Sequence, residues 1–249
     1  MQEHLYHHFS TLDSTNILAL AMAEQGAEHG TVIHADRQSG GRGRGKRKFA
    51  SPVGGLYFSL ILRPELDLVD LPLLTLAAGT GLCLSFREAL SVPVMMKWPN
   101  DLYVYERKMA GILTESGPIR GGQAEFVVIG VGVNVSTAPE LFPQELRQKS
   151  ISLVHVTEHC PSIEVLLPLF VNAMQQAAQR LAEAKEELLA DWRTFDYLKG
   201  RALRYLRHEE EIPATGIGLA PDGQYIIVDT QGIEHQVLAG DLNPVKPVS

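Results

Sequence analysis

Apolar positions in the first two hundred residues follow two different periods. Short continuous apolar runs are typical of buried strands, and they occupy 31–35, 55–62, 94–98 and 125–136. Longer segments with helical spacing occupy 72–91 and 162–195, the second with an expected break near 184–186. The polar cluster Asp13–Asn16 offers N-cap residues for a shorter helix that ends near Gly26. Strands and helices mixed in this way predict an α/β or α+β sheet domain.

The pattern changes after Gly200, where short apolar runs are separated by turn-forming residues at 221–223 and 231–232. These runs predict a small β-barrel of about 50 residues, close to the lower size limit for a domain that folds alone. Upstream, the segment 102–116 predicts a hairpin, or one strand that is interrupted near Arg107. We therefore expect two domains, formed by residues 1–197 and 198–249.

Composition places the chain among ordinary globular proteins, with 249 residues, 45% hydrophobic, 20% charged and a net charge of −7. The N-terminus has no secretory signal pattern, and no apolar run reaches the ~20 residues that span a bilayer. The two cysteines, Cys83 and Cys160, have neither disulfide-framework nor zinc spacing, so a reducing cytoplasm is the expected compartment. The overall acidity argues against a protein that coats nucleic acid.

Positive charge is nevertheless concentrated in one loop. From Arg37 to Lys48, six of twelve residues are Lys or Arg, and glycine alternates with arginine in GGRGRGKRK (40–48). Gly40 and Gly45 have the spacing of a phosphate loop, but Arg47 replaces the Ser or Thr of that motif, and the following SPVGG excludes its helix. Three interpretations of the loop are considered: nucleic-acid binding, an anion held by guanidinium groups on a flexible backbone, and a solvated tip.

Two further stretches carry candidate chemistry. In KWPNDLYVYERK (97–108), Lys108 lies at the mouth of an apolar strand, where its ammonium would be partly desolvated, and Asp101 ends a turn. The alternatives are a snorkelling lysine and a simple turn residue. In IGVGVN (129–134), Gly130, Gly132 and Asn134 share one face of a strand and leave a flat patch on which a planar ring can rest. The alternative is a weak strand with a close backbone neighbour, and a dinucleotide fingerprint is excluded because no helix follows.

In their order along the chain, these motifs resemble those of the biotin protein ligases. The resemblance rests on Asp13-Ser14-Thr15-Asn16, Gln38-x-x-Gly41-Arg42-Gly43-Arg44, Ser51-Pro52, Lys97-Trp98-Pro99-Asn100-Asp101-Leu102, Lys108-x-Ala110-Gly111-Ile112-Leu113 and Gly130-x-Gly132-x-Asn134. It covers the whole chain and implies an α+β fold, with a mixed-sheet catalytic domain like that of class II aminoacyl-tRNA synthetases and biotin/lipoate ligases, followed by an SH3-like β-barrel. Only about a dozen residues precede the first motif, so we expect the short class without an N-terminal DNA-binding domain.

The resemblance implies a two-step reaction. The carboxylate of biotin attacks the α-phosphate of ATP, with Mg²⁺ bound, and gives biotinyl-5′-AMP and pyrophosphate. A lysine on the biotin carboxyl carrier domain of acetyl-CoA carboxylase, or of a related carboxylase, then attacks the mixed anhydride. No prosthetic group is expected. Neither DNA nor a membrane is an expected partner, and edge-to-edge pairing of the sheet would give a homodimer.

The resemblance also implies roles for individual residues. Those implied to contact biotin or its adenylate are Ser14, Thr15, Asn16, Gln38, Gly41, Arg42, Gly43, Arg44, Lys108 and Gly111. Those implied to contact the nucleotide are Arg47, Phe49, Asn100, Gly130, Gly132 and Asn134. The implied catalytic residues are Lys108, Arg44 and Asp101, and Asp101 is also the candidate Mg²⁺ ligand or partner of the acceptor lysine.

Two residues depart from the family pattern. Lys46 occupies a position where glycine is usual, and Phe49 stands where a tryptophan commonly stacks on adenine. Because phenylalanine offers less stacking area, it predicts a lower nucleotide affinity. Lipoate ligase and octanoyltransferase, which share the fold superfamily, are rival functions. A non-enzymatic nucleic-acid binder that uses residues 37–48 is a third, although the rest of the chain lacks basic stripes.

Overall fold

The computed structural model describes residues 5–45, 47–207, 210–238 and 240–245. Its main sheet has seven strands in the order β1-β2-β3-β9-β6-β5-β4. They are β1 (Tyr6–Phe9), β2 (Val32–Ala35), β3 (Gly55–Leu62), β4 (Met95–Lys97), β5 (Asp101–Val104), β6 (Arg107–Ser116) and β9 (Val127–Asn134). β1 and β2 pair in parallel and the other neighbours are antiparallel, so the predicted mixed sheet is confirmed.

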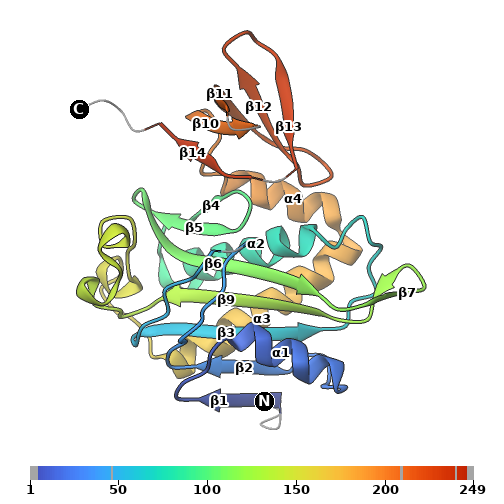
Figure 1. The fold of residues 1–249 in the computed structure, drawn as a ribbon, viewed down its shortest axis with the longest axis vertical. Coiled ribbons are helices and arrows are strands. Elements are labelled where there is room, and N and C mark those ends of the chain that lie inside the picture. Colours follow the sequence, from blue (N-terminus) through green and yellow to red (C-terminus); the bar gives the residue numbers. More distant parts are fainter. Residues whose placement is uncertain (1–4, 46, 208–209, 239, 246–249) are drawn as a thin grey trace.

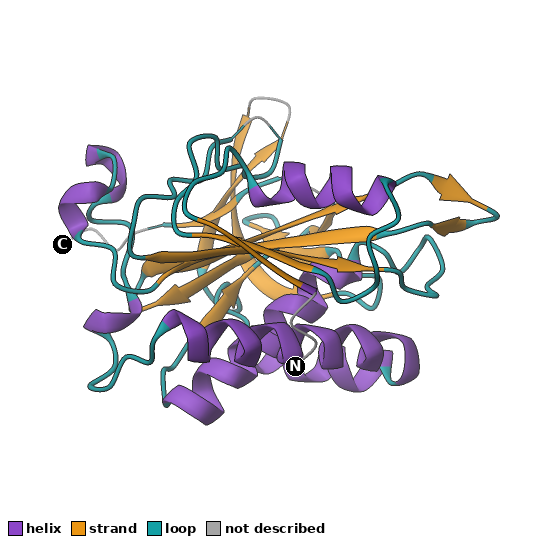
Figure 2. Cartoon of the chain, turned by 90° about the horizontal axis from the view of Figure 1, so that it is seen from below, coloured by secondary structure: helices purple, strands orange, loops and turns teal. Residues whose placement is uncertain are grey.

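Helices cover both faces of this sheet, which Figure 2 shows close to edge-on between them. On one face, α1 (Thr15–Glu24) buries Ala19 and Ala23 against the strands in a small core. On the other face, α2 (Leu73–Leu90) and α3 (Ile163–Glu183) pack into the large core, and α4 (Lys185–Thr194) follows (Figure 1). The predicted break in the last helical segment is confirmed, because Ala184 separates α3 from α4.

The fold also decides between the two alternatives expected for residues 102–116. The segment around Arg107 is a hairpin, in which β5 and β6 are joined by a tight turn at Tyr105 and Glu106, both with positive φ. β7 (Ile119–Arg120) and β8 (Gln123–Ala124) form a second, two-stranded hairpin. By length and composition α2 could cross a membrane, but 67% of it is buried inside the protein, as expected for a core helix.

The C-terminal segment forms a second sheet of five antiparallel strands, in the order β13-β12-β11-β10-β14. They are β10 (Ala202–Arg207), β11 (Glu210–Leu219), β12 (Tyr225–Asp229), β13 (Glu234–Val237) and β14 (Leu242–Pro244). The predicted turns at 221–223 and 231–232 connect β11 to β12 and β12 to β13. The predicted C-terminal β structure is confirmed, while the domain boundary between 197 and 198 stays a prediction.

Packing around Tyr225 joins the second sheet to the first. The fully buried ring of Tyr225 contacts Trp98, which follows β4, and Trp192 of α4. Its hydroxyl donates to the carboxylate of Asp196 at 2.8 Å, and Trp98 Nε1 donates to the carbonyl of Gly223 at 3.0 Å. This packing brings the edge strand β14 to the rim of a cavity in the main sheet.

Candidate active site

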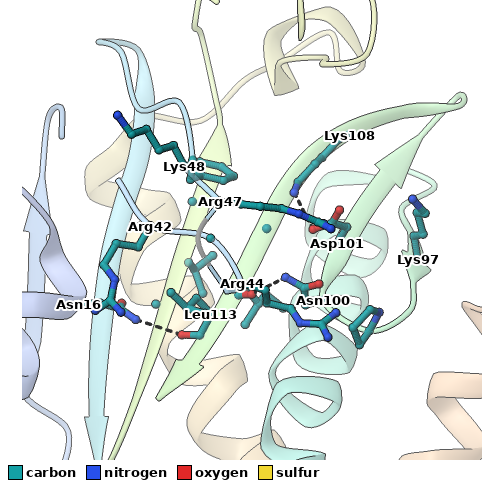
Figure 3. A pocket seen from close by; sticks show the side chains of 18 of the residues that line it. Asn16, Arg42, Arg44, Arg47, Lys48, Lys97, Asn100, Asp101, Lys108 and Leu113 are labelled. Carbon is teal, nitrogen blue, oxygen red and sulfur yellow. Dashed lines mark hydrogen bonds and ion pairs between the residues drawn. The ribbon is translucent and has the colours of Figure 1, made fainter. Parts of the chain in front are cut away.

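A cavity of about 110 Å³ opens where the central strands meet the basic loop and the edge of the second sheet (Figure 3). Most of the predicted site residues line it: Ser14, Thr15, Asn16, Gln38, Arg42, Gly43, Arg44, Arg47, Phe49, Asn100, Asp101, Lys108, Gly111, Gly130 and Gly132. They come from the start of α1, the loop between β2 and β3, the β4–β5 turn and strands β6 and β9. The fold therefore brings together motifs that are more than a hundred residues apart.

One end of the cavity is a buried network of neutral side chains. Gln38 accepts a hydrogen bond from the backbone N–H of Thr15 at 2.8 Å and donates one to Ser51 Oγ at 2.8 Å. The hydroxyl of Ser59, fully buried in β3, donates to Asn16 Oδ1 at 2.6 Å and lies 2.8 Å from Thr15 Oγ1. Such a network fixes the orientation of its members and suits a neutral polar ligand group.

The start of α1 directs its first residues into this network. Ser14 is the N-cap residue but makes no side-chain capping bond, so the helix does not use its hydroxyl. Thr15 and Asn16 follow in the first turn and are buried, although polar residues are usually exposed. The polar side chains at the start of α1 therefore line the cavity, whereas a helix N-terminus would ordinarily use such groups to cap its own backbone N–H groups.

Glu115 connects the neutral network to the basic loop. Its Oε2 accepts a hydrogen bond from Asn16 Nδ2 at 2.9 Å, and its Oε1 lies 2.9 Å from Arg42 Nη2. Asn16 Nδ2 also donates to the carbonyl of Leu113 at 3.2 Å (Figure 3). Arg42, which the resemblance implies to contact biotin or its adenylate, is thereby held against β6 by a carboxylate of the protein itself.

The floor of the cavity consists of glycines on β6 and β9. A Cβ on Gly130 would overlap the side-chain amide of Asn16, and a Cβ on Gly132 would overlap the ring of Phe49. Gly111 is paired with Gly132 across the two strands and lies under the same ring. The predicted flat patch is present, and in this structure the ring that rests on it is Phe49.

The basic loop folds back on itself above this floor. The N–H of Gly43 donates to the carbonyl of Arg47 at 2.9 Å, and the N–H of Phe49 donates to the carbonyl of Gly41 at 2.8 Å. These bonds give the loop a short hairpin-like form that its alternating pattern did not predict. The departure at Lys46 lies outside the described residues.

Lys108 and Asp101 form an ion pair on the cavity wall (Figure 3). The Nζ of Lys108 lies 2.6 Å from Asp101 Oδ1, and 5.5 Å from the centre of the Phe49 ring. The two charged side chains are 30% and 21% exposed, so they are partly shielded from water. The structure thus pairs two residues that the sequence singled out separately, and it places both in the cavity rather than on an open surface.

Two predicted residues do not line the cavity. Asn134 Nδ2 donates to the carbonyls of Lys108 (3.4 Å) and Ile151 (3.3 Å), and its buried Oδ1 has no hydrogen-bond partner in the described part of the chain. A Cβ on Gly41 would overlap the carbonyl of Phe49, so this glycine permits the close packing of the loop. In this structure Asn134 supports the strand of Lys108, Gly41 supports the loop, and their predicted ligand contacts stay predictions.

The cavity is strongly cationic although the chain is acidic. The charged residues that line it are Arg42, Arg44, Arg47, Lys48, Lys97, Lys108, Asp101 and Asp241. Arg47 forms a two-pronged ion pair with Asp241 of the second sheet, with Nη1 2.9 Å from Oδ1. Arg44 and Lys48 have no ion pair within the described ranges. Burial lowers the pKa of Arg44, and Asp241 opposes that shift. This excess of positive charge suits a ligand with several negative charges.

The carboxylates of the cavity do not form a metal site by themselves. Within the described residues, no group of three or more His, Cys, Asp or Glu side chains could hold an ion. Asp101 offers one carboxylate, and Lys108 holds one of its oxygens. Mg²⁺ usually binds through one or two carboxylates together with substrate phosphates. These residues therefore fit an ion that arrives with a nucleotide, rather than a resident metal.

Several residues of the site were not predicted. Ser59 could have been found as the single polar residue inside the apolar run GLYFSLIL, because a fully buried hydroxyl needs a partner. Glu115 is the penultimate residue of β6 and carries no comparable signal. Asp241 is 194 positions from Arg47, and no periodicity or motif connects the two.

The comparisons with known proteins agree with this geometry. Residues 9–134 match the model of the Biotin/lipoate A/B protein ligase family. A Bacillus subtilis protein named "Bifunctional ligase/repressor BirA" is 40% identical over 154 residues, which are 61% of this chain and 47% of that protein. This chain thus spans about half the length of that relative. A Mycobacterium tuberculosis protein named "Biotin--[acetyl-CoA-carboxylase] ligase" is 31% identical over 243 residues, which are 92% of this chain and 85% of that protein.

Among solved structures, the biotin protein ligase from Aquifex aeolicus in complex with biotin and ATP superposes with a TM-score of 0.80 at 26% identity. The match covers 97% of this chain and 98% of that one, so it includes both sheets. From the family model, the relatives and the shared fold, we conclude that the chain belongs to the Biotin/lipoate A/B protein ligase family.

Proposed function

We propose that this chain is an ATP-dependent biotin protein ligase. It activates biotin as biotinyl-5′-AMP with release of pyrophosphate, and it transfers the biotinyl group to a lysine of a biotin carboxyl carrier domain. The observation that carries this proposal is a single cavity with a neutral hydrogen-bonding end, a glycine floor and a cationic end where Lys108 and Arg44 lie. The neutral end suits a bicyclic urea, the glycine floor suits a planar ring, and the cationic end suits a carboxylate and a phosphate chain.

The neutral end suits the ureido group of biotin. Gln38, Thr15 and Asn16 present amide and hydroxyl groups whose orientation the buried network holds. A site with prepositioned donors and acceptors rejects an analogue that lacks the matching groups, because its own polar atoms would then be left unpaired. Lipoate and octanoate lack a urea, and this difference favours biotin.

Lys108 is the proposed stabiliser of both chemical steps. In the first step the biotin carboxylate forms an O–P bond to the α-phosphate and pyrophosphate leaves, while negative charge grows on the phosphoryl oxygens. In the second step a lysine amine forms a C–N bond to the acyl carbon and AMP leaves. A fixed ammonium beside the glycine floor stabilises both transition states, and Arg44 adds a second cation. Asp101, paired with Lys108, is the proposed partner of the acceptor lysine or of Mg²⁺.

ATP and Mg²⁺ are the proposed co-substrate and ion. Mg²⁺ bound to the phosphates would be held from the protein side by Asp101 and would neutralise the leaving pyrophosphate. Arg47, Asn100 and the floor glycines lie in the cavity where the nucleotide must extend. Asn134 lies outside the cavity lining, so its contact with the nucleotide stays a prediction.

The proposed acceptor is the biotin carboxyl carrier domain of acetyl-CoA carboxylase or a related carboxylase, an assignment supported by the name of the Mycobacterium tuberculosis relative. The proposed compartment is the cytoplasm, where such a carboxylase and ATP are both available. A homodimer through an edge of the main sheet, with no role for DNA or a membrane, completes the proposal.

Pyrophosphate exchange tests the first half-reaction without any acceptor protein. Labelled pyrophosphate should enter ATP only when biotin and Mg²⁺ are both present, because adenylation is reversible. Biotin, lipoate and octanoate are compared at equal concentration, and transfer is followed with a purified carrier domain and its Lys→Arg variant. Exchange that runs with lipoate or octanoate but not with biotin would move the assignment to the sister enzymes.

A further inference from the structure

A carboxylate of the second sheet reaches the cavity of the first. Asp241 directly precedes β14 and lines the cavity together with Leu242. Both of its oxygens pair with the guanidinium of Arg47, whose Nη1 lies 2.9 Å from Oδ1. The side chains of Arg47 and Asp241 are 66% and 36% exposed, which places the pair at the rim, where a ligand can also reach it.

The same strand holds a second cation of the cavity. Two residues after Asp241, Asn243 accepts a hydrogen bond from Lys97 Nζ at 2.9 Å. Asn243 does not line the cavity itself, so it contacts the cavity only through Lys97. Lys97 and Arg47 both line it, one from β4 and one from the basic loop. The edge of the second sheet thus contacts the cationic end at two points.

The surroundings of Asp241 keep it charged. Burial alone would raise the pKa of this carboxyl, but the hydrogen bonds and charge of Arg47, together with Lys97 and Arg44, outweigh burial and lower it. An exposed arginine otherwise samples many rotamers, and a bidentate carboxylate restricts it to few. In Figure 3, Arg47 extends across the cavity toward the side where Asp101 and Lys108 lie.

We propose that Asp241 is a positioning residue for catalysis: it holds the guanidinium of Arg47 at the phosphate end of the cavity, so that the second sheet completes the nucleotide site. The proposal rests on the proposed function of the cavity. The competing interpretation is that Asp241 occupies Arg47 and must be displaced by phosphate. Positioning is favoured because Asp241 takes one N–H from each Nη of Arg47, and the remaining N–H groups let a polyphosphate share the same guanidinium without breaking the pair.

Exchange kinetics separate these interpretations. Asp241→Asn should raise the KM for ATP roughly three- to tenfold and leave kcat at saturating ATP nearly unchanged. Asp241→Glu, which keeps the charge, should recover part of the loss. The matched control is Glu234→Gln, which removes the same charge from β13 at the opposite edge of the same sheet. A lower KM in Asp241→Asn would overturn the proposal in favour of competition with phosphate.

A double-mutant cycle tests whether Asp241 acts through Arg47. In an Arg47→Met background, Asp241→Asn should have no further effect on the KM for ATP, because the group that it positions is gone. Additive effects would mean that Asp241 contacts the nucleotide or its metal independently, and they would refute a positioning role.

A measurement made without substrate tests the Arg47–Asp241 contact independently of the proposed function. Trypsin cleavage after Arg47, followed by mass spectrometry, should be several times faster in Asp241→Asn than in wild type or Glu234→Gln, because the free arginine enters the protease readily. If the wild type shows no biotin-dependent exchange but the cleavage difference is present, the proposed function fails and the Arg47–Asp241 contact stands. Equal cleavage in all three proteins would remove the contact and the proposal with it.

Discussion

The ammonium group of Lys108 stabilises the transition states of both proposed half-reactions. Removing a charge-assisted hydrogen bond to a partly buried anion costs about 1.5–3 kcal/mol, and more when the bond strengthens in the transition state. Lys108→Ala should therefore slow pyrophosphate exchange and biotinyl transfer by at least about tenfold each. Its melting temperature should change little, because a partly exposed ion pair contributes about 1 kcal/mol or less. Full activity in a folded Lys108→Ala protein would exclude this lysine from the mechanism.

The glycine floor makes a second prediction at single residues. In Gly130→Ala the new Cβ overlaps the amide of Asn16, which must move and give up hydrogen bonds to Ser59 and Glu115. Loss of two such bonds should weaken biotin binding by about tenfold or more, measured by calorimetry. Gly121→Ala is the control, because this glycine lies outside the cavity in the turn between β7 and β8 and its Cβ would meet nothing within 4 Å. Equal affinity in both variants would contradict the proposed use of the network.

At the scale of elements, the junction between the two sheets depends on one buried carboxylate. Asp196 precedes the second sheet and accepts hydrogen bonds from Tyr225 Oη at 2.8 Å and from the N–H of Leu198 at 2.9 Å. Burial raises the pKa of Asp196, whereas the hydrogen bond from Tyr225 opposes the rise. The ionised form is thus costly, and the stability that the carboxyl contributes decreases as pH rises through its folded pKa.

Tyr225→Phe should therefore destabilise the protein in a pH-dependent way. The variant lacks the donor that supports the ionised carboxylate, so its free energy of unfolding should fall by about 1.5–3 kcal/mol at pH 8. At pH 4 a larger share of the Asp196 carboxyl is protonated than at pH 8, because burial raises its pKa, and the loss should be smaller. Urea denaturation of wild type and variant at both pH values measures the difference. Tyr105→Phe, at an exposed position, is the control, and an equal loss at both pH values would contradict this account.

Element positions were largely predictable from the sequence, because they depend on local periodicity. The fully buried strand β3 coincides with the predicted run 55–62, and the break between α3 and α4 lies where it was expected. The hairpin-like form of the basic loop was not predictable, because it depends on the fold of the floor below it. Phe49 lies on Gly132 only because β9 and β6 have been brought together beneath the loop.

For the whole molecule, the basic loop is the part that a ligand should change most. Its like charges repel each other, and Glu115 and Asp241 supply only part of the counter-charge. Biotin or its adenylate would add the missing negative charge and should protect residues 40–50 from proteolysis by roughly tenfold or more. Limited proteolysis with and without biotin measures this. Equal protection in both states would favour the interpretation of the loop as a solvated tip.

Retention of the reactive intermediate depends on the same loop. Arg44 lies half-buried in the cavity without an ion pair in the described part of the chain, so its charge is available to the adenylate phosphate. Arg44→Gly should speed dissociation of biotinyl-5′-AMP about tenfold or more while slowing its synthesis less, and bystander lysines should become labelled. Rapid-filtration release rates measure this directly. Arg120→Gly, which alters an exposed arginine outside the cavity, is the control, and an unchanged release rate in Arg44→Gly would refute the proposed role.

The sequence by itself determined most of the strands and helices, the glycine face of β9 and the concentration of charge between Arg37 and Lys48, since each follows from residues close together in the chain. The tertiary structure alone decided which charges meet. Glu115 holds Arg42, and Asp241 of the second sheet holds Arg47. These pairs depend on strand register and on the docking of one sheet against another. Periodicity encodes which face of an element is buried, but it does not encode which distant side chain lies opposite.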